Sequence, residues 1–221
     1  TRADDYARAI TDSTALLLRV HPSNFTMEGF VERPERSELV ALGKPFFEDL
    51  GSGALLPFDG EADVAEALSV GATLVCFSGD KLLGGSQAGI IVGEKEAVEA
   101  CRRHPLYRAL RLDKLALAAL EATLRLYVQG MESTVPAIAM LKGSQSELAS
   151  ALQEDLKAMG IDALIEADVG YSGGGALPGQ ALEGSVVRIP CDSPDFPAKL
   201  LREQHPSILG RVARSGLIID P

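Results

Sequence analysis

The stretch ATLVCFSGDKLLGGSQAGIIVG (residues 72–93) places one lysine in a loop of small residues between two apolar runs. The first run, residues 72–77, is continuously apolar and contains β-branched residues, which predicts a strand buried on both faces of a sheet. In open α/β sheets, ligands bind beyond the carboxyl ends of the strands. Lys81 comes shortly after this run, so the sequence predicts a reactive amine at a strand end.

Helical and strand-like patterns alternate through the first half of the chain. The strand-like runs are residues 15–20, 45–53, 72–77 and 88–93, and the helical ones are residues 4–10, 37–43 and 63–71. Such alternation predicts an α/β fold with a mainly parallel sheet and helices on its faces. We expect the sheet to lack its opening strands. The connection at Gly43 and Lys44 is short for an αβ loop, and we expect residues to be missing there.

The pattern changes after residue 112. Two long amphipathic helices are predicted over residues 113–130 and 145–160, followed by short strand-like runs and one more helix. We therefore expect a partial large domain over residues 1–132 and a small C-terminal α+β domain over residues 133–221. The glycine run at residues 173–175 is a loop to which the sequence assigns no role.

Composition narrows the function classes. The 221 residues are 46% hydrophobic and 24% charged, which is typical of a globular protein, and the net charge of −10 argues against nucleic-acid binding by the surface as a whole. The three cysteines are widely spaced and each histidine precedes a proline, so we expect neither a disulfide framework nor a metal site. Cys76 is interpreted as a small core residue. The sequence contains neither a membrane-spanning run nor a signal peptide, and a cytoplasmic protein is expected.

The residues near Lys81 suit a pyridine cofactor. A lysine desolvated at a strand end can act as a Schiff-base nucleophile and as a proton carrier. A buried carboxylate, here Asp49 at the end of another strand, can keep a pyridinium nitrogen protonated, as pyridoxal phosphate needs. The hydroxyl of Ser78 and the backbone amides of Gly84 and Gly85 suit the phosphate of such a cofactor.

The segment FSGDKLLGGSQAGIIVG, with EDLGSG before it and HPLYRALRLDKLALAALEATLRLY after it, resembles the bacterial selenocysteine synthase (L-seryl-tRNA(Sec) selenium transferase) family. The resemblance extends over nearly the whole chain. It implies fold type I, the aspartate aminotransferase-like architecture with pyridoxal 5'-phosphate. Two departures stand out: the family's upstream region, with the tRNA-binding domain and the first part of the cofactor domain, is absent, and Ser86 replaces a proline.

The resemblance also implies roles for individual residues. Lys81 corresponds to the lysine that binds the cofactor, Asp49 to the aspartate at the pyridine nitrogen, and Asn24 to a polar residue near the cofactor. Arg108 and Arg111 correspond to arginines that hold the selenophosphate-side anion, and their spacing predicts one shared helix face. Without the family, a solvated helix face is the alternative for this pair.

The implied activity is conversion of L-seryl-tRNA(Sec) to L-selenocysteinyl-tRNA(Sec) with selenophosphate, through a dehydroalanyl intermediate. Lys81 would remove the Cα proton. The implied partners are seryl-tRNA(Sec), bound through the absent region, and further copies of the chain: at least a homodimer, and a homodecamer for the full-length protein. The alternatives are a pyridoxal phosphate lyase acting on a small amino acid or amino sugar, and a truncated non-catalytic core.

Three polar residues near the site keep two interpretations each. Asp80 either caps the loop or orients the cofactor or the lysine. Gln87 has the same two roles open to it. His21 is either a satisfied strand-end side chain or a group close to the cofactor.

Overall fold

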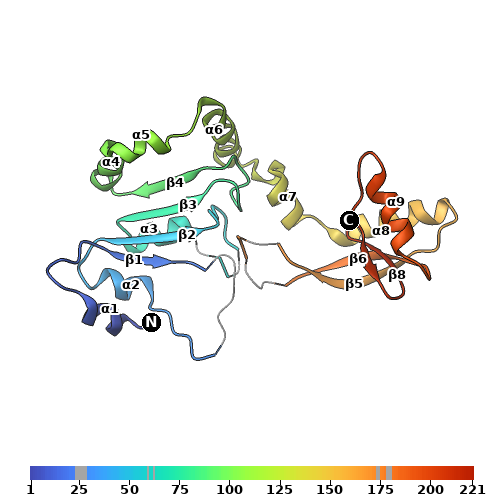
Figure 1. Cartoon of the computed structure of the whole chain (residues 1–221), viewed down its shortest axis with the longest axis horizontal. Helices are drawn as coiled ribbons and strands as arrows, with labels where there is room; N and C mark the ends of the chain where they lie inside the picture. Colours follow the sequence, from blue (N-terminus) through green and yellow to red (C-terminus); the bar gives the residue numbers. More distant parts are fainter. Residues whose placement is uncertain (23–28, 59, 62, 173–174, 178–180) are drawn as a thin grey trace. The chain divides into compact units, whose positions relative to one another are not determined.

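The computed structural model describes residues 1–22, 29–58, 60–61, 63–172, 175–177 and 181–221, which form two compact units. The first unit comprises Thr1–Lys142 together with Ser172–Gln180, and the second comprises Gly143–Tyr171 and Ala181–Pro221 (Figure 1). The units therefore divide after Lys142, beyond the boundary at residue 132 that the sequence suggested. The assignment of separate roles to two domains stays a prediction.

A four-stranded sheet forms the centre of the first unit, in the order β1-β2-β3-β4 (Figure 1). Its strands are β1 (Leu17–Val20), β2 (Phe46–Gly51), β3 (Leu74–Ser78) and β4 (Gly89–Gly93). β1, β2 and β3 are parallel, whereas β3 and β4 are antiparallel. The mostly parallel α/β sheet is confirmed. β4 runs the other way because residues 79–88 contain no helix and are too few for a crossover.

The helices of the first unit begin and end at recognisable residues. They are α1 (Ala3–Ala9), α2 (Arg36–Val40), α3 (Val64–Val70), α4 (Lys95–Arg103), α5 (Pro105–Leu110), α6 (Lys114–Val128), the 3-10 helix η1 (Glu132–Thr134) and α7 (Pro136–Lys142). Asp63 caps α3 by accepting from the next two free amides, and Gly71 ends it in the left-handed region at φ 107°. Residues 41–45 join α2 to β2, so the connection expected to be incomplete has the usual length.

The core of the first unit lies on one face of the sheet. Buried side chains of α2, β2, α3 and β3 pack together there, among them Leu39, Phe46, Leu50, Val64, Ala67, Val75 and Phe77. On the other face, Cys76 is half-buried, and Leu18, Val20 and Ile91 are exposed. β3 itself is fully buried only toward the core, because its residues alternate between the core and a face on which they are partly exposed.

The second unit is an antiparallel sheet with two helices. Its strand order is β5-β6-β8-β7, with β5 (Leu164–Gly170), β6 (Leu182–Pro190), β7 (Arg211–Ala213) and β8 (Gly216–Ile219), and its helices are α8 (Gln145–Ala158) and α9 (Asp195–Glu203) (Figure 1). Ala149 of α8 packs with Ala163 and Val187 in its core. The small α+β part of the fold is confirmed. Over the described ranges, no helix is long and apolar enough to cross a membrane.

Candidate active site

Lys81 lies in a loop that is closed by its own backbone. The amide of Gly79 donates to the carbonyl of Ala88 at 2.9 Å, and the amide of Gly85 donates to the carbonyl of Gly79 at 2.7 Å. The amide of Gly84 donates to the carbonyl of Lys81 itself at 2.9 Å. These bonds fix the direction of the chain immediately beyond the carboxyl end of β3, where the sequence predicted the amine.

Neighbouring segments hold the same loop. The amide of Leu82 donates to the carbonyl of Ser52, just after β2, at 3.0 Å. The hydroxyl of Tyr127 on α6 donates to the carbonyl of Leu83 at 3.0 Å. Burial raises the pKa of Tyr127, and the charge of Glu132 adds to this, so the phenol remains a donor at neutral pH. The lysine loop is thus tied to β2 on one side and to α6 on the other.

Ser86 stands where the family resemblance predicts a proline. Its hydroxyl donates to the carbonyl of Ala116 on α6 at 2.8 Å. A proline has no side-chain donor and could not make this bond. The departure from the family pattern therefore adds an anchor to the loop.

The two adjacent glycines of the loop serve packing. Gly84 has φ 71°, and a Cβ added there would collide with Val135. A Cβ added at Gly85 would lie 3.1 Å from Leu120 Cδ1 on α6. Both amides already donate within the loop. The small residues let the loop approach its neighbours, and these amides are not offered to a phosphate as the sequence suggested.

Asp49 lies near the carboxyl end of β2, opposite Cys76 of β3. Its carboxylate accepts a hydrogen bond from the amide of Gly51 at 3.0 Å. Burial, helped by the charge of Asp49, raises the pKa of Cys76 to about 12. Cys76 is therefore a thiol at neutral pH, which suits a packing role. Ser78 lies two residues further along β3 and so faces the same side of the sheet.

A segment distant in sequence packs on the lysine. Gly175 belongs to the first unit and has φ 101°, and a Cβ added there would lie 3.1 Å from Lys81 Cε and 3.6 Å from Nζ. Ala176 and Leu177 are buried against Leu82. Glycine suits the positive φ at this point, and a Cβ there would crowd the end of the lysine side chain. The glycine run that lacked a role in the sequence thus contributes a neighbour of Lys81.

Sequence reasoning missed Glu61, whose side chain is 0% exposed. Its carboxylate accepts short hydrogen bonds from the hydroxyl of Ser52 and from the amide of Leu177. His21 Nε2 lies 4.0 Å from Glu61 Oε2, and this buried nitrogen has no hydrogen-bond partner within the described part of the chain. Burial lowers the pKa of His21 despite the opposing charge of Glu61, so the ring is neutral at pH 7.

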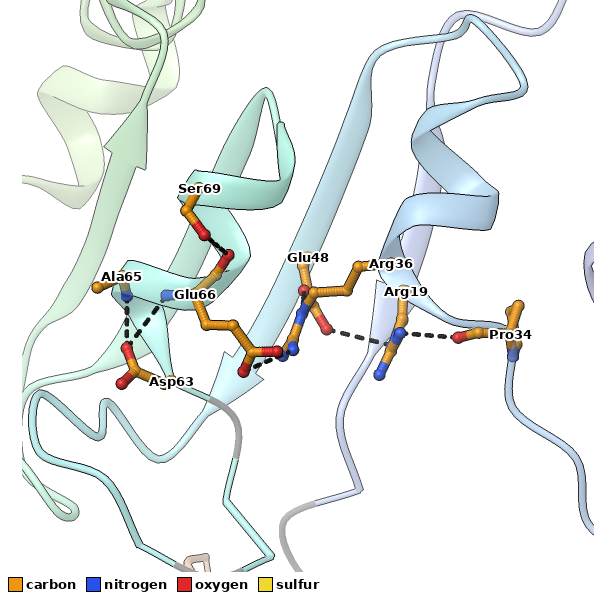
Figure 2. A network of polar contacts seen from close by, with 8 residues as sticks. All are labelled: Arg19, Pro34, Arg36, Glu48, Asp63, Ala65, Glu66 and Ser69. Atoms are coloured by element: carbon orange, nitrogen blue, oxygen red, sulfur yellow. Dashed lines mark hydrogen bonds and ion pairs between the residues drawn. The ribbon is translucent and has the colours of Figure 1, made fainter.

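A second buried carboxylate, Glu48, lies next to Asp49 in the chain but on the opposite face of β2. Figure 2 shows it between two arginines: Arg19 Nε lies 3.1 Å from Oε1, and Arg36 Nε lies 2.7 Å from Oε2. Arg36 Nη1 also pairs with Glu66 of α3 at 3.1 Å. Burial would lower the pKa of Arg36, but hydrogen bonding and attraction to Glu48, then to Glu66, raise it.

The remaining predicted site residues are either outside the described ranges or exposed. Asn24 lies outside the described residues. Arg108 is exposed on α5, and Arg111 is exposed with extended backbone at the end of that helix. The single helix face predicted for this pair is not formed, because α5 ends before Arg111. Asp80 and Gln87 are exposed. In the described ranges, no group of three His, Cys, Asp or Glu residues could hold a metal ion.

Comparisons with known proteins agree with this picture. The family model described as L-seryl-tRNA selenium transferase matches residues 1–221. Proteins named L-seryl-tRNA(Sec) selenium transferase are 45% identical in Carboxydothermus hydrogenoformans and 42% identical in Hyphomonas neptunium. Each match covers 100% of this chain and 51% of the relative, so the chain spans about half the length of these relatives.

Among solved structures, D-glucosaminate-6-phosphate ammonia-lyase matches with a TM-score of 0.59 at 23% identity, over 99% of this chain and 55% of that one. This likeness concerns the fold, and the fold type I architecture expected from the sequence is confirmed. The family match extends over every residue, including the lysine loop and the segment that packs on it. The chain belongs to the L-seryl-tRNA selenium transferase family.

Proposed function

We propose that this chain carries the cofactor lysine of an enzyme that converts L-seryl-tRNA(Sec) to L-selenocysteinyl-tRNA(Sec) with selenophosphate. The observation that carries the proposal is the family match over residues 1–221, joined to the position of Lys81. This lysine lies on a closed loop beyond the carboxyl end of β3, and Asp49 lies near the carboxyl end of the neighbouring parallel strand. Such strand ends are where open α/β sheets bind ligands.

The amine and the carboxylate fit pyridoxal 5'-phosphate. Gly175 leaves space along the Lys81 side chain, and Asp49 is held in place by the amide of Gly51. Lys81 would attach the cofactor, Asp49 would bind its ring nitrogen, and the Ser78 hydroxyl would support its phosphate. Bound there, pyridoxal phosphate supplies an electron sink for the charge that develops on the substrate Cα.

The residues of the chain then divide the remaining work. The Lys81 amine takes the Cα proton of the seryl group, and this proton can return to Cα at the end of the reaction. The Cβ–O bond of serine would break, and the hydroxyl would take a proton from solvent and leave as water. The selenium of selenophosphate would then bond to Cβ, and water would cleave its P–Se bond to release phosphate. Arg108 and Arg111 are exposed cations that would hold the selenophosphate anion through charge-assisted hydrogen bonds. Asn24 is proposed as a further polar contact with the cofactor.

The tRNA is proposed to bind mainly outside this chain. The chain has a net charge of −10, which opposes a phosphate backbone, and it spans about half the length of its relatives. We infer that the full-length protein is at least a homodimer, with a homodecamer as the larger assembly, and that it works in the cytoplasm.

The test is formation of selenocysteinyl-tRNA by the full-length protein supplied with pyridoxal phosphate, seryl-tRNA(Sec) and selenophosphate. Lys81→Ala should lower the rate by at least about 10²- to 10⁴-fold, since it removes the general base as well as the attachment point. Lys95→Ala, at an exposed position on α4, is the matched control. Turnover of a small amine without any selenocysteinyl product would support the lyase alternative instead.

A second measurement tests the lysine assignment directly. Borohydride reduction in the presence of pyridoxal phosphate should label Lys81, as mapped by peptide mass spectrometry. A label on Lys95 or Lys114 in place of Lys81 would overturn the assignment. Absence of any label would favour a non-catalytic core.

A further inference from the structure

We propose that Glu61 is a positioning residue that holds segment 175–177 against Lys81. Its effect on catalysis rests on the proposed function, whereas its effect on the surroundings of Lys81 does not. The proposal joins two features to which the sequence assigned no role, a buried glutamate and the end of a glycine run.

Glu61 accepts hydrogen bonds from two separate parts of the chain. Its side chain is 0% exposed, and its two oxygens are used separately. Oε2 accepts from the hydroxyl of Ser52, and Oε1 accepts from the amide of Leu177. Burying a carboxylate is costly unless hydrogen bonds compensate for lost hydration. The two hydrogen bonds supply this compensation, so the buried carboxylate holds the two groups that donate to it.

Ser52 and the segment that contains Leu177 both contact the lysine loop. The carbonyl of Ser52 accepts from the amide of Leu82, the residue that follows Lys81, at 3.0 Å. Leu177 lies two residues after Gly175, which packs on the Lys81 side chain. Glu61 therefore links the support of the Lys81 backbone to the cover over the Lys81 side chain.

In the described part of the chain, segment 175–177 has one further side-chain hydrogen bond, from the hydroxyl of the nearby Ser172 to the carbonyl of Ala176 at 2.7 Å. The segment is brought to the loop from 116 residues away in the sequence from Glu61, and ordering such a long connection has an entropic cost. The apolar cluster that receives it is small: its buried members are Ala54, Leu82, Ala176 and Leu177, and the partly buried Phe58 and Leu141 pack against them. Burial in this cluster offsets part of that cost, and the hydrogen bond from Leu177 to Glu61 adds the polar contact with a distant part of the chain, so its loss should change how often the segment opens.

The experiment measures how fast each lysine of the full-length protein is acetylated by dilute acetic anhydride, without pyridoxal phosphate or tRNA. Lys81 is partly buried, and opening of the segment should expose it further. Glu61→Ala should raise its rate about tenfold relative to Lys95 and Lys114, because a buried amide loses its acceptor. Glu61→Gln keeps an acceptor oxygen and should restore most of the protection. Glu66→Gln, an exposed carboxylate paired with Arg36, is the control.

A wild-type rate at Lys81 in folded Glu61→Ala would overturn the proposal. If that variant unfolds, all lysines gain reactivity together, and the milder Ser52→Ala decides. A selective gain at Lys81 of about twofold supports the proposal, and no gain overturns it.

Because acetylation requires neither cofactor nor tRNA, its result is independent of the proposed function. In the selenium transfer assay, Glu61→Ala should lower kcat more than it changes KM, with partial rescue by Glu61→Gln. If the wild-type protein forms no selenocysteinyl product but the acetylation pattern is as expected, the proposed function is wrong and the positioning role of Glu61 still holds.

Discussion

Two buried glutamates in the first unit are held in opposite ways. Glu48 on β2 lies between the guanidinium groups of Arg19 and Arg36. Glu61 accepts hydrogen bonds from a hydroxyl and a backbone amide, and Nε2 of the neutral His21 ring lies 4.0 Å from its Oε2. Both carboxylate side chains are 0% exposed, so burial alone does not distinguish them.

The two glutamates have different partners, and this indicates different roles: Glu48 supports the core, whereas Glu61 supports the surroundings of Lys81. Through its arginines Glu48 connects β1, β2 and α2, and Arg36 extends the connection to Glu66 on α3 (Figure 2). All of these elements belong to the core of the unit. Glu61 instead holds main chain beside Lys81. An ion-pair network of this kind should govern global stability, whereas an acceptor for neutral donors should govern local opening.

The largest expected effect comes from Glu48→Ala. Removing this carboxylate leaves two arginines without their buried partner, and we expect the free energy of unfolding to fall by about 3–5 kcal/mol. Denaturant unfolding followed by circular dichroism measures the loss. A change below about 1 kcal/mol would mean that the network does not support the core, and the comparison would fail.

Glu61→Ala should cost less globally and more locally. Two buried donors lose an acceptor, which predicts a loss of about 1–3 kcal/mol in the free energy of unfolding. Hydrogen exchange measured by mass spectrometry should accelerate in peptides covering residues 175–177. Under the same native conditions Glu48→Ala should leave these peptides closer to wild type. Equal acceleration in the two variants would contradict the division of roles.

His21→Gln tests the neutral histidine beside Glu61, through the pH dependence of the free energy of unfolding. Burial lowers the pKa of His21 below its ordinary 6.5, so between these two values the unfolded chain binds more protons than the folded one. The free energy of unfolding of the wild type should therefore fall as the pH drops from 6.5 through the lowered pKa. His21→Gln should flatten this part of the pH profile. Identical wild-type and variant profiles would show that the ring is not desolvated.

The smallest effect is expected at the edge of the arginine network. Glu66 pairs with Arg36, but its side chain is 60% exposed, so Glu66→Gln should change the free energy of unfolding by about 0–1 kcal/mol. Added salt should reduce even this difference. A loss as large as that of Glu48→Ala would show that the network acts as one unit.

Local patterns predicted much of the fold. Apolar runs anticipated the four strands of the first sheet, and Asp63 and Gly71 marked the ends of α3. The mainly parallel sheet was predicted, but the alternation of strands and helices did not indicate that β4 runs antiparallel to β3, which follows from a lysine loop too short for a crossover. The shared face of Arg108 and Arg111 was also wrong, since α5 ends one residue too early.

The site was predicted only where it is continuous in sequence. Lys81 follows a recognisable strand, and its loop has a composition that stands out. Glu61 carries no local signal, because a glutamate before a helix is ordinarily a solvated residue. Its burial depends on Leu177, which the chain brings back 116 residues later.

The sequence by itself determined the alternation of strands and helices, the place of Lys81 beyond a strand end and the family, because these depend on residues close together along the chain. Only the tertiary structure decided which carboxylate meets arginines, which one meets the segment over the lysine, and where the amides of Gly84 and Gly85 donate. Those outcomes depend on which distant groups reach each other once the sheet has formed. The spacing of side chains along the sequence does not predict these long-range contacts.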